Sequence, residues 1–152
     1  MPSARPKFVV DEMLGSLARW LRIMGYDTTY ERDRADKDIL AIALREGRIL
    51  LTRDVQLSQR AAPGSLLIDS PDLDEQLKQV TLAFGLKAGE EMTRCTMCNG
   101  DLKAVSKEEA AGKVPDGSLE SNDEFFTCTR CGKMYWKGAH WKNIRQRLSG
   151  LR

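Results

Sequence analysis

The sequence contains no long apolar run and only one histidine, His140, among its 152 residues. A helix that crosses a bilayer needs about 20 mostly apolar residues. The short basic start of the chain is followed by only three apolar residues before Asp11. We therefore expect neither a signal peptide nor a membrane span, and we expect a protein of the reducing cytoplasm.

Acidic residues are missing from the end of the chain. Residues 130–152 include seven basic residues and no acid. Residues 1–91 carry a net charge of −2 and residues 92–152 a net charge of +4. A basic segment beside an acidic cleft suits a protein that acts on a polyanion, although a basic helix face can also simply be solvated.

The four cysteines are confined to residues 95–131, and this confinement suggests two structural units. A segment of about 60 residues has too little core to be stable without a metal or disulfides. We predict a first unit over residues 1–88, a second over 92–152, and a linker near residues 85–92. We find no internal repeat apart from the two CxxC pairs.

Strand and helix patterns alternate through the first unit, which predicts an α/β fold with a parallel sheet flanked by helices. Strands are expected at 7–10, 26–30, 49–52 and 65–68, and helices at 13–24, 36–47, after Asp54 and after Pro71. The first helix would bury Met13, Leu14, Leu17, Ala18, Leu21 and Met24, and turn Arg19 and Arg22 away from the core. In the second helix, Asp36 would be the N-cap, ahead of the apolar residues Ile39, Leu40, Ala43 and Leu44.

Several acids follow the predicted strands. The carboxyl ends of parallel strands meet at one sheet edge, where ligands bind. Repulsion among carboxylates there is relieved by a divalent cation such as Mg²⁺ or Mn²⁺, which can activate water for phosphodiester hydrolysis. Each acid has the alternative interpretation of a helix cap or turn residue. The candidates are Asp11, Asp36, Asp38, Asp54 and Asp69; Arg19 and Arg53 are candidates for phosphate binding or for ion pairs.

The cysteines form two CxxC pairs, Cys95 with Cys98 and Cys128 with Cys131. Each pair offers two thiolates in geometry suited to tetrahedral Zn²⁺. Four cysteine ligands leave no open position, so we predict a structural rather than a catalytic zinc. Disulfides and an iron–sulfur cluster are the alternatives that the spacing and the compartment favour less.

The second unit is expected to contain a mobile loop over residues 107–122, a hairpin of strands at 125–127 and 133–136, and a basic helix over 141–148. Basic and aromatic residues at its end can stack on bases and pair with phosphates. The candidates for RNA contact are Lys133, Lys137, His140, Trp141 and Lys142. Alternatively, Tyr135, Trp136 and Trp141 form the core of the small unit.

Taken together, these patterns resemble the Mut7-C family, a branch of PIN-like ribonuclease domains with a C-terminal zinc ribbon. The matching stretches cover nearly the whole chain: residues 10–22, 25–27, 36–40 and 47–54, both CxxC pairs, and residues 135–141. The resemblance implies a PIN-like fold, a zinc-bearing nucleic-acid module, and attack of a metal-activated water on RNA. The resemblance also implies that the acids of the metal site are Asp11, Asp36 and Asp54, with lesser roles for Asp38 and Asp69. Arg19 or Arg53 would offset the charge of the phosphate.

Our first hypothesis is a metal-dependent endoribonuclease whose zinc ribbon binds RNA. The alternative is a non-catalytic RNA- or ribosome-binding protein with a degenerate PIN-like site. A regulatory protein partner is compatible with either. A DNA-binding regulator is a third interpretation, for which we find no helix-turn-helix pattern.

Overall fold

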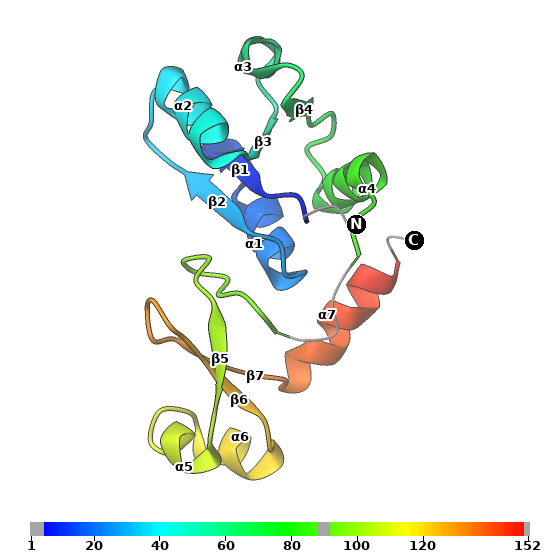
Figure 1. Ribbon diagram of the computed structural model, residues 1–152. Coiled ribbons are helices and arrows are strands. Elements are labelled where there is room, and N and C mark those ends of the chain that lie inside the picture. The colour runs from blue at the N-terminus through cyan, green and yellow to red at the C-terminus, as the bar shows by residue number, and fades with distance from the viewer. Residues whose placement is uncertain (1–4, 88–91, 151–152) are drawn as a thin grey trace.

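A four-stranded parallel sheet forms the first unit (Figure 1). The computed structural model describes residues 5–87 and 92–150. The strands are β1 (Phe8–Asp11), β2 (Thr28–Glu31), β3 (Ile49–Thr52) and β4 (Ser65–Leu67), in the order β2-β1-β3-β4. All three pairings are parallel. The predicted parallel sheet is confirmed, with β2 beginning two residues later than expected.

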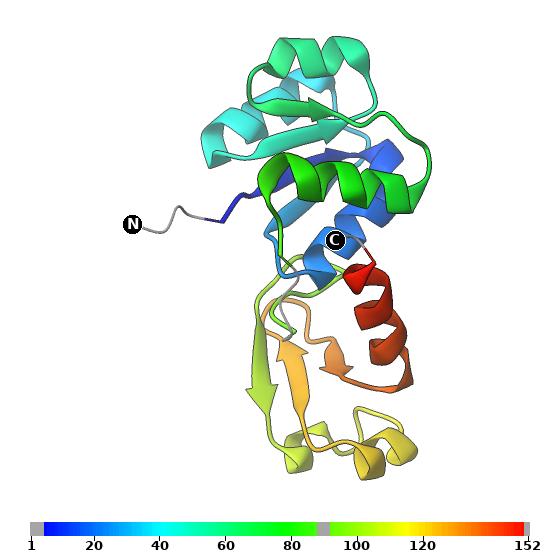
Figure 2. The same cartoon turned by 90° about the vertical axis from the view of Figure 1, so that its right-hand side faces the viewer.

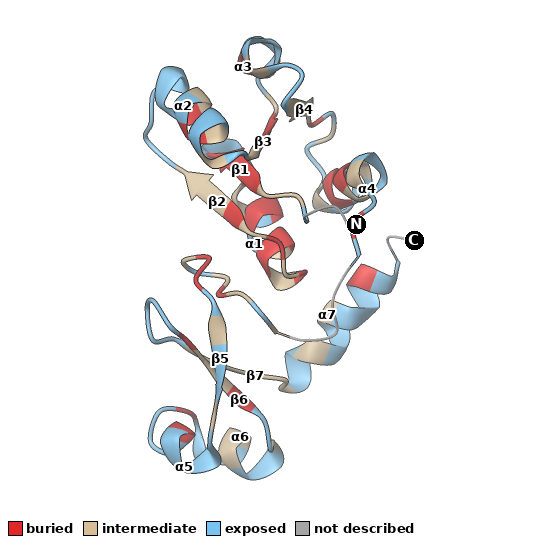
Figure 3. Cartoon of the chain, in the orientation of Figure 1, coloured by how far each residue is buried: buried red, intermediate tan, exposed pale blue. Residues whose placement is uncertain are grey.

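Helices cover both faces of this sheet. A cluster containing Phe8 and Val10 packs with α1 (Gly15–Ile23) and α4 (Leu73–Phe84). Val9, between them, turns to the opposite face and packs with α2 (Asp36–Glu46) and α3 (Val55–Ala61). Both faces of β1 are thus buried, as Figure 3 shows, which explains the continuously apolar strands.

Four expectations about helix residues were wrong. Asp36 is the first residue of α2, and Ala35 is its N-cap. Met13 lies in a 3₁₀ turn (Glu12–Leu14) ahead of α1 and is 68% exposed. Leu44 is 86% exposed because the inner face of α2 is formed by Ile39 and Ile42. Arg22, expected on the outer side of its helix, is buried.

The second unit is a three-stranded antiparallel sheet in the order β5-β6-β7. Its strands are β5 (Leu102–Val105), β6 (Phe125–Cys128) and β7 (Met134–Trp136). β6 and β7 match the predicted hairpin, whereas β5 was not predicted. The expected loop at 107–122 contains two short helices, α5 (Lys107–Ala110) and α6 (Asp116–Ser121), because Ala110 and Val114 pack against Phe125.

The last helix, α7 (Ala139–Ser149), returns to the first unit beside α1 and α4 (Figure 2). Leu148 is part of the same core cluster as Leu17 and Leu77. Arg147 forms an ion pair of 2.7 Å with Asp74, and its guanidinium lies 5.0 Å from the ring centroid of Trp20. The two units are therefore joined by packing as well as by the chain, whose predicted linker lies partly outside the described residues.

None of the helices in the described ranges is long and apolar enough to span a membrane.

Candidate active site and metal centre

The candidate active site lies where the strand order reverses. From β1 the chain moves outward to β2, and from β3 it moves outward to β4, on the other side. A crevice opens at such a point, between the carboxyl ends of the two central strands. Asp11 is the last residue of β1, and Asp54 lies two residues beyond the end of β3. These two candidate acids therefore flank the reversal point.

Asp11 is a buried carboxylate without a cationic partner. It is 8% exposed and accepts hydrogen bonds from the hydroxyl of Thr52 and, at 3.3 Å, from the backbone N–H of Met13. Within the described part of the chain it forms no ion pair. Burial raises the pKa of Asp11 above its ordinary value, and the charge of Asp54 adds to this rise, although the two hydrogen bonds oppose it.

Asp54 is exposed and caps α3. One of its carboxylate oxygens, Oδ1, accepts from the N–H of Leu57 at 3.0 Å. Its own N–H donates to Oγ1 of Thr52, also at 3.0 Å. Thr52 therefore connects the two acids. We did not select Thr52 from the sequence, although a threonine at the end of a buried strand and two residues before an acid is a signal that could have been used.

The other predicted acids are more dispersed. Asp36 and Asp38 are exposed in the first turn of α2, and Asp36 lies 3.8 Å from Arg60. Asp69 is exposed after β4, where its N–H donates to Gln79. Among the residues described, the four cysteines are the one group of three or more potential ligands whose atoms gather closely enough to hold an ion. Asp11 is close enough to Asp54 and to its neighbour Glu12 for their charges to raise its pKa, but within the described residues these acids do not gather as closely as the four cysteines.

The two candidate phosphate-binding arginines differ in their surroundings. Arg53 follows Thr52 directly and is partly buried, and its Nε has no hydrogen-bond partner among the described residues. A buried donor without an acceptor is unfavourable. An anionic ligand at this edge would supply one. Arg19 is exposed on α1.

The four cysteine sulfurs form a compact cluster within 4.8 Å of one another. Sγ of Cys95 lies 3.6 Å from that of Cys131, and Sγ of Cys98 lies 3.4 Å from that of Cys128. All four are free, as expected for distances far above the roughly 2.05 Å of a disulfide. Zinc bonds of about 2.3 Å in a tetrahedron require sulfurs about 3.8 Å apart. The cluster therefore fits a tetrahedral zinc ion.

The surroundings lower the pKa of two of the four thiols, Cys95 and Cys128, whereas burial raises the pKa of Cys98 to about 12. Burial works to raise the pKa of Cys128, but hydrogen bonds from the backbone N–H groups of Cys131 and Arg130 outweigh it and hold the pKa at about 6. The backbone also approaches closely, since a Cβ on Gly100 would lie 2.8 Å from the sulfur of Cys128. The hydroxyl of Tyr135 lies 3.0 Å from the sulfur of Cys95 and accepts from the N–H of Thr96.

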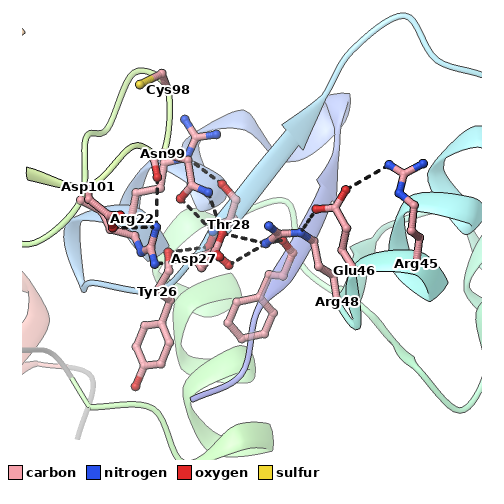
Figure 4. Close-up of polar contacts among 12 residues, drawn as sticks. Arg22, Tyr26, Asp27, Thr28, Arg45, Glu46, Arg48, Cys98, Asn99 and Asp101 are labelled. Carbon is pink, nitrogen blue, oxygen red and sulfur yellow. Dashed lines mark hydrogen bonds and ion pairs between the residues drawn. The ribbon is translucent and has the colours of Figure 1, made fainter. Parts of the chain in front are cut away.

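A polar network joins the cysteine unit to the amino ends of the parallel strands (Figure 4). Asp27 accepts from Nη1 of Arg48 at 2.8 Å and from Nδ2 of Asn99 at 2.7 Å. Oδ1 of Asn99 in turn accepts from the N–H of Thr28 at 2.9 Å. Asn99 follows Cys98 directly, so the first CxxC pair is fixed to the sheet.

Arg22 adds a second connection at the same place. Its Nε donates to the carbonyl of Thr28 at 2.8 Å, and its Nη1 donates to the carbonyl of Thr96, between the first two cysteines, at 2.9 Å. The sequence placed Arg22 on a solvent face by helical spacing alone. Nothing local indicates that a second unit covers that face.

The predicted RNA-contact residues lie at the end of the second unit. Lys133 precedes β7, Lys137 follows it, and His140, Trp141 and Lys142 lie in the first turn of α7. Lys133, His140 and Lys142 are exposed. Lys133 lies beside the second CxxC pair, since its carbonyl accepts a hydrogen bond from the N–H of Cys128.

Comparison with known families supplies the remaining observation. A family model described as the Mut7-C RNAse domain matches residues 6–148. The chain is a member of the Mut7-C family. The Mut7-C match includes both the acidic sheet edge and the four cysteines, so one family unit spans both parts of the structure. Its description indicates a ribonuclease-like function. Neither the curated proteins nor the solved structures include a match to this Mut7-C chain.

Proposed function

We propose that this protein is a metal-dependent endoribonuclease whose site lies at the acidic sheet edge. The observation that carries the proposal is Asp11, a buried acid beside a second carboxylate at the reversal point of a parallel sheet, without a cation of its own. Two such charges are costly unless a cation lies between them. Membership of a family described as an RNAse domain supports RNA as the substrate class.

The residues present fit a magnesium or manganese ion. Mg²⁺ keeps several waters and is usually held by one or two carboxylates together with substrate phosphate. Asp11 and Asp54 would be its protein ligands, with Asp36, Asp38 and Asp69 as outer acids. When bound, such an ion supplies an activated water and charge stabilisation for phosphodiester hydrolysis. Thr52 orients the Asp11 carboxylate by its hydrogen bond.

The edge also offers positive groups for a phosphate. The Nε of Arg53 lacks an acceptor within the protein as described, and a phosphate oxygen would be a matching partner. Arg19, on the neighbouring α1, would offset phosphate charge further along the RNA.

In this proposal the second unit is a zinc ribbon that binds RNA. Zinc held by Cys95, Cys98, Cys128 and Cys131 would stabilise a unit whose own buried core is small. The candidate RNA contacts are Lys133, Lys137, His140, Trp141 and Lys142. The basic residues among them offer phosphate contacts that are independent of sequence.

A second candidate function is RNA or ribosome binding without catalysis. It is favoured because, within the described residues, no three carboxylates gather closely enough at the sheet edge to hold an ion together. Such a protein would use the zinc ribbon and the basic helix and would not require a divalent ion at the sheet edge.

The test is cleavage of labelled single-stranded and structured RNA with Mg²⁺ or Mn²⁺, comparing wild type with Asp11→Asn and Asp54→Asn. Asparagine keeps the shape of each side chain and remains a good helix cap. Asp72→Asn is a matched control, because Asp72 caps α4 through the N–H of Glu75 as Asp54 caps α3. We expect metal-dependent cleavage that falls at least about a hundredfold in the two site variants and is unchanged in the control.

Two outcomes would reject the proposed nuclease activity of this site. If wild type binds RNA in a salt-sensitive manner but never cleaves it, the binding function replaces the catalytic one. If cleavage persists equally in all variants, the activity resides in a contaminant or at another site.

A further inference from the structure

Two hollows meet at Trp141 on the surface of the second unit. The larger has a volume of about 770 Å³ and lies between α6, β7 and α7. The smaller, of about 520 Å³, lies along α7. Gly138 and Trp141 line both. Trp141 therefore borders both hollows and is only partly buried.

The two hollows differ in chemistry. The larger is lined by the aromatic side chains of Tyr135, Trp136 and Trp141 and by small polar ones such as Ser118 and Asn122. The smaller is lined by the cations Lys137, Lys142 and Arg145. Among the described residues, no carboxylate lines either of them. A flat aromatic wall with hydrogen-bonding groups beside a cationic hollow matches a nucleotide, which has a planar base and a phosphate.

The neighbouring aromatic residues have structural partners that Trp141 lacks. Trp136 packs against the core of the second unit, with its ring centroid 6.4 Å from that of Phe125. Tyr135 is engaged with Cys95 and Thr96 beside the cysteine cluster. Trp141 belongs to none of the three core clusters among the described residues. The alternative that all three aromatics form the core thus holds for Trp136 only.

The immediate surroundings of Trp141 favour stacking with an anionic ligand. Nζ of Lys137 lies 5.5 Å from the centroid of its ring, which keeps a cation at the ring face. Gly138 allows the chain to turn closely over Trp136, since a Cβ there would lie 2.9 Å from the indole nitrogen. A larger residue would narrow the point at which the two hollows meet.

We propose that Trp141 is the stacking platform for an unpaired base of single-stranded RNA. The base would occupy the larger hollow, and the adjoining phosphates would lie over Lys137, Lys142 and Arg145. Bases in a duplex are already stacked and cannot enter such a hollow, whereas unpaired bases can. This inference rests on the proposed function for its choice of RNA, and it adds that the second unit selects unpaired RNA.

Binding should be measured by fluorescence anisotropy with zinc-loaded full-length protein, labelled single-stranded RNA, and a duplex of the same sequence. Mg²⁺ and Mn²⁺ are omitted so that no cleavage occurs. We expect Trp141→Ala to weaken single-strand binding about tenfold, Trp141→Phe to weaken it much less, and neither to change duplex binding by more than about twofold. Lys142→Gln should lower the salt slope by about 1, and Trp141→Ala should leave it unchanged.

Lys103→Gln is the matched charge control, because Lys103 lies on β5, at the opposite edge of the sheet from β7. It should leave single-strand affinity unchanged. A second readout detects stacking directly: RNA with a single 2-aminopurine should lose fluorescence on binding wild type but not Trp141→Ala. Circular dichroism and zinc content confirm that each variant is folded.

The outcomes separate this inference from the proposed function. If wild type cleaves RNA and folded Trp141→Ala binds single strands equally well, the platform is rejected and the nuclease stands. If Trp141→Ala abolishes binding of an acidic peptide while RNA binding is unchanged, the hollows form a protein-binding site and the inference is wrong. If wild type neither binds nor cleaves RNA, both proposals fail.

Discussion

The two edges of the parallel sheet give an aspartate opposite electrostatic surroundings. At the amino edge, Asp27 accepts hydrogen bonds from Arg48 and Asn99. Partial burial works to raise its pKa, but these bonds outweigh burial and lower the pKa. At the carboxyl edge, burial raises the pKa of Asp11, and its only hydrogen-bond donors among the described residues are Thr52 and Met13.

This difference separates a structural acid from one available to a ligand. Asp27 has its cations within the protein, so an external ion has little to add. Asp11 is buried beside another negative charge, and only something from outside can neutralise both. The cysteine unit covers the amino edge through Asn99 and Arg22. The carboxyl edge is at the far end of the strands from this contact.

Removal of the proposed zinc should have the largest effect on the amino edge, because it removes the partners that the second unit supplies there, Asn99 and Thr96. Structural zinc contributes about 10–16 kcal/mol in zinc-finger peptides. We expect a chelator to unfold the second unit and to lower the melting temperature of the first, since Asn99 and Thr96 would no longer hold Asp27 and Arg22. Hydrogen exchange should show lost protection in β5–β7 and at Thr28. Added Zn²⁺, but not Mg²⁺, should restore both.

A chelated protein whose first unit keeps its melting temperature would show that the two units are stabilised independently. The contacts of Asp27 and Arg22 with the second unit would then contribute little.

Exchanging the two acids for asparagine tests the comparison directly. Asp27→Asn removes one of the two carboxylates that the partly buried Arg48 faces, the other being Glu46, and should lower the free energy of unfolding by about 2 kcal/mol. Asp11→Asn removes an uncompensated buried charge and should leave stability unchanged or increase it. Urea unfolding at pH 7 measures both. Equal losses in the two variants would contradict the division into a structural and a functional acid.

The sequence predicted the sheet well because local patterns determine it. The apolar runs at Phe8 and Leu50 are buried on both faces, and the glycines after α2 and α4 adopt the left-handed conformation that ends those helices. The same reasoning could not identify Arg22, because helical spacing shows which side of α1 is polar but not that Thr96 will cover it. Contacts between units depend on tertiary arrangement.

The candidate site could be predicted in part for a similar reason. Strand ends are visible in a sequence, so Asp11 and Asp54 could be selected as candidates, and the charge of Asp54 acts on Asp11. Side-chain reach is not visible, so Asp36, which lies near Arg60, was grouped with them. The strand β5 was missed because its outward residues, Lys103 and Ala104, give no alternating apolar pattern.

Arg22→Met should weaken the amino edge by a smaller amount. Methionine is of comparable length but donates no hydrogen bond, so the carbonyls of Thr28 and Thr96 lose their donor. We expect a loss of about 1–2 kcal/mol in the free energy of unfolding and faster transfer of zinc to a competing chelator. Arg19→Met, at an exposed position of the same helix, is the control and should change neither. Equal behaviour of the two variants would assign Arg22 no role in joining the units.

The dependence of stability on pH should show the smallest effect and the sharpest contrast. Folding raises the pKa of Asp11, so the folded state binds the proton of this carboxyl group more tightly than the unfolded state does. The stability that this group contributes is therefore present below about pH 3.8 and declines as the pH rises through the folded pKa. Folding lowers the pKa of Asp27, so its contribution is complete above pH 3.8 and is lost as pH falls through the folded value. Urea unfolding from pH 3 to 7 should therefore give difference curves of opposite slope for Asp11→Asn and Asp27→Asn against wild type.

If Mn²⁺ binds at Asp11, adding it should reduce the decline at higher pH in wild type but not in Asp11→Asn, because the ion competes with the proton for the same carboxylate. Difference curves of the same slope for the two variants would mean that folding shifts the pKa of Asp11 and of Asp27 in the same direction.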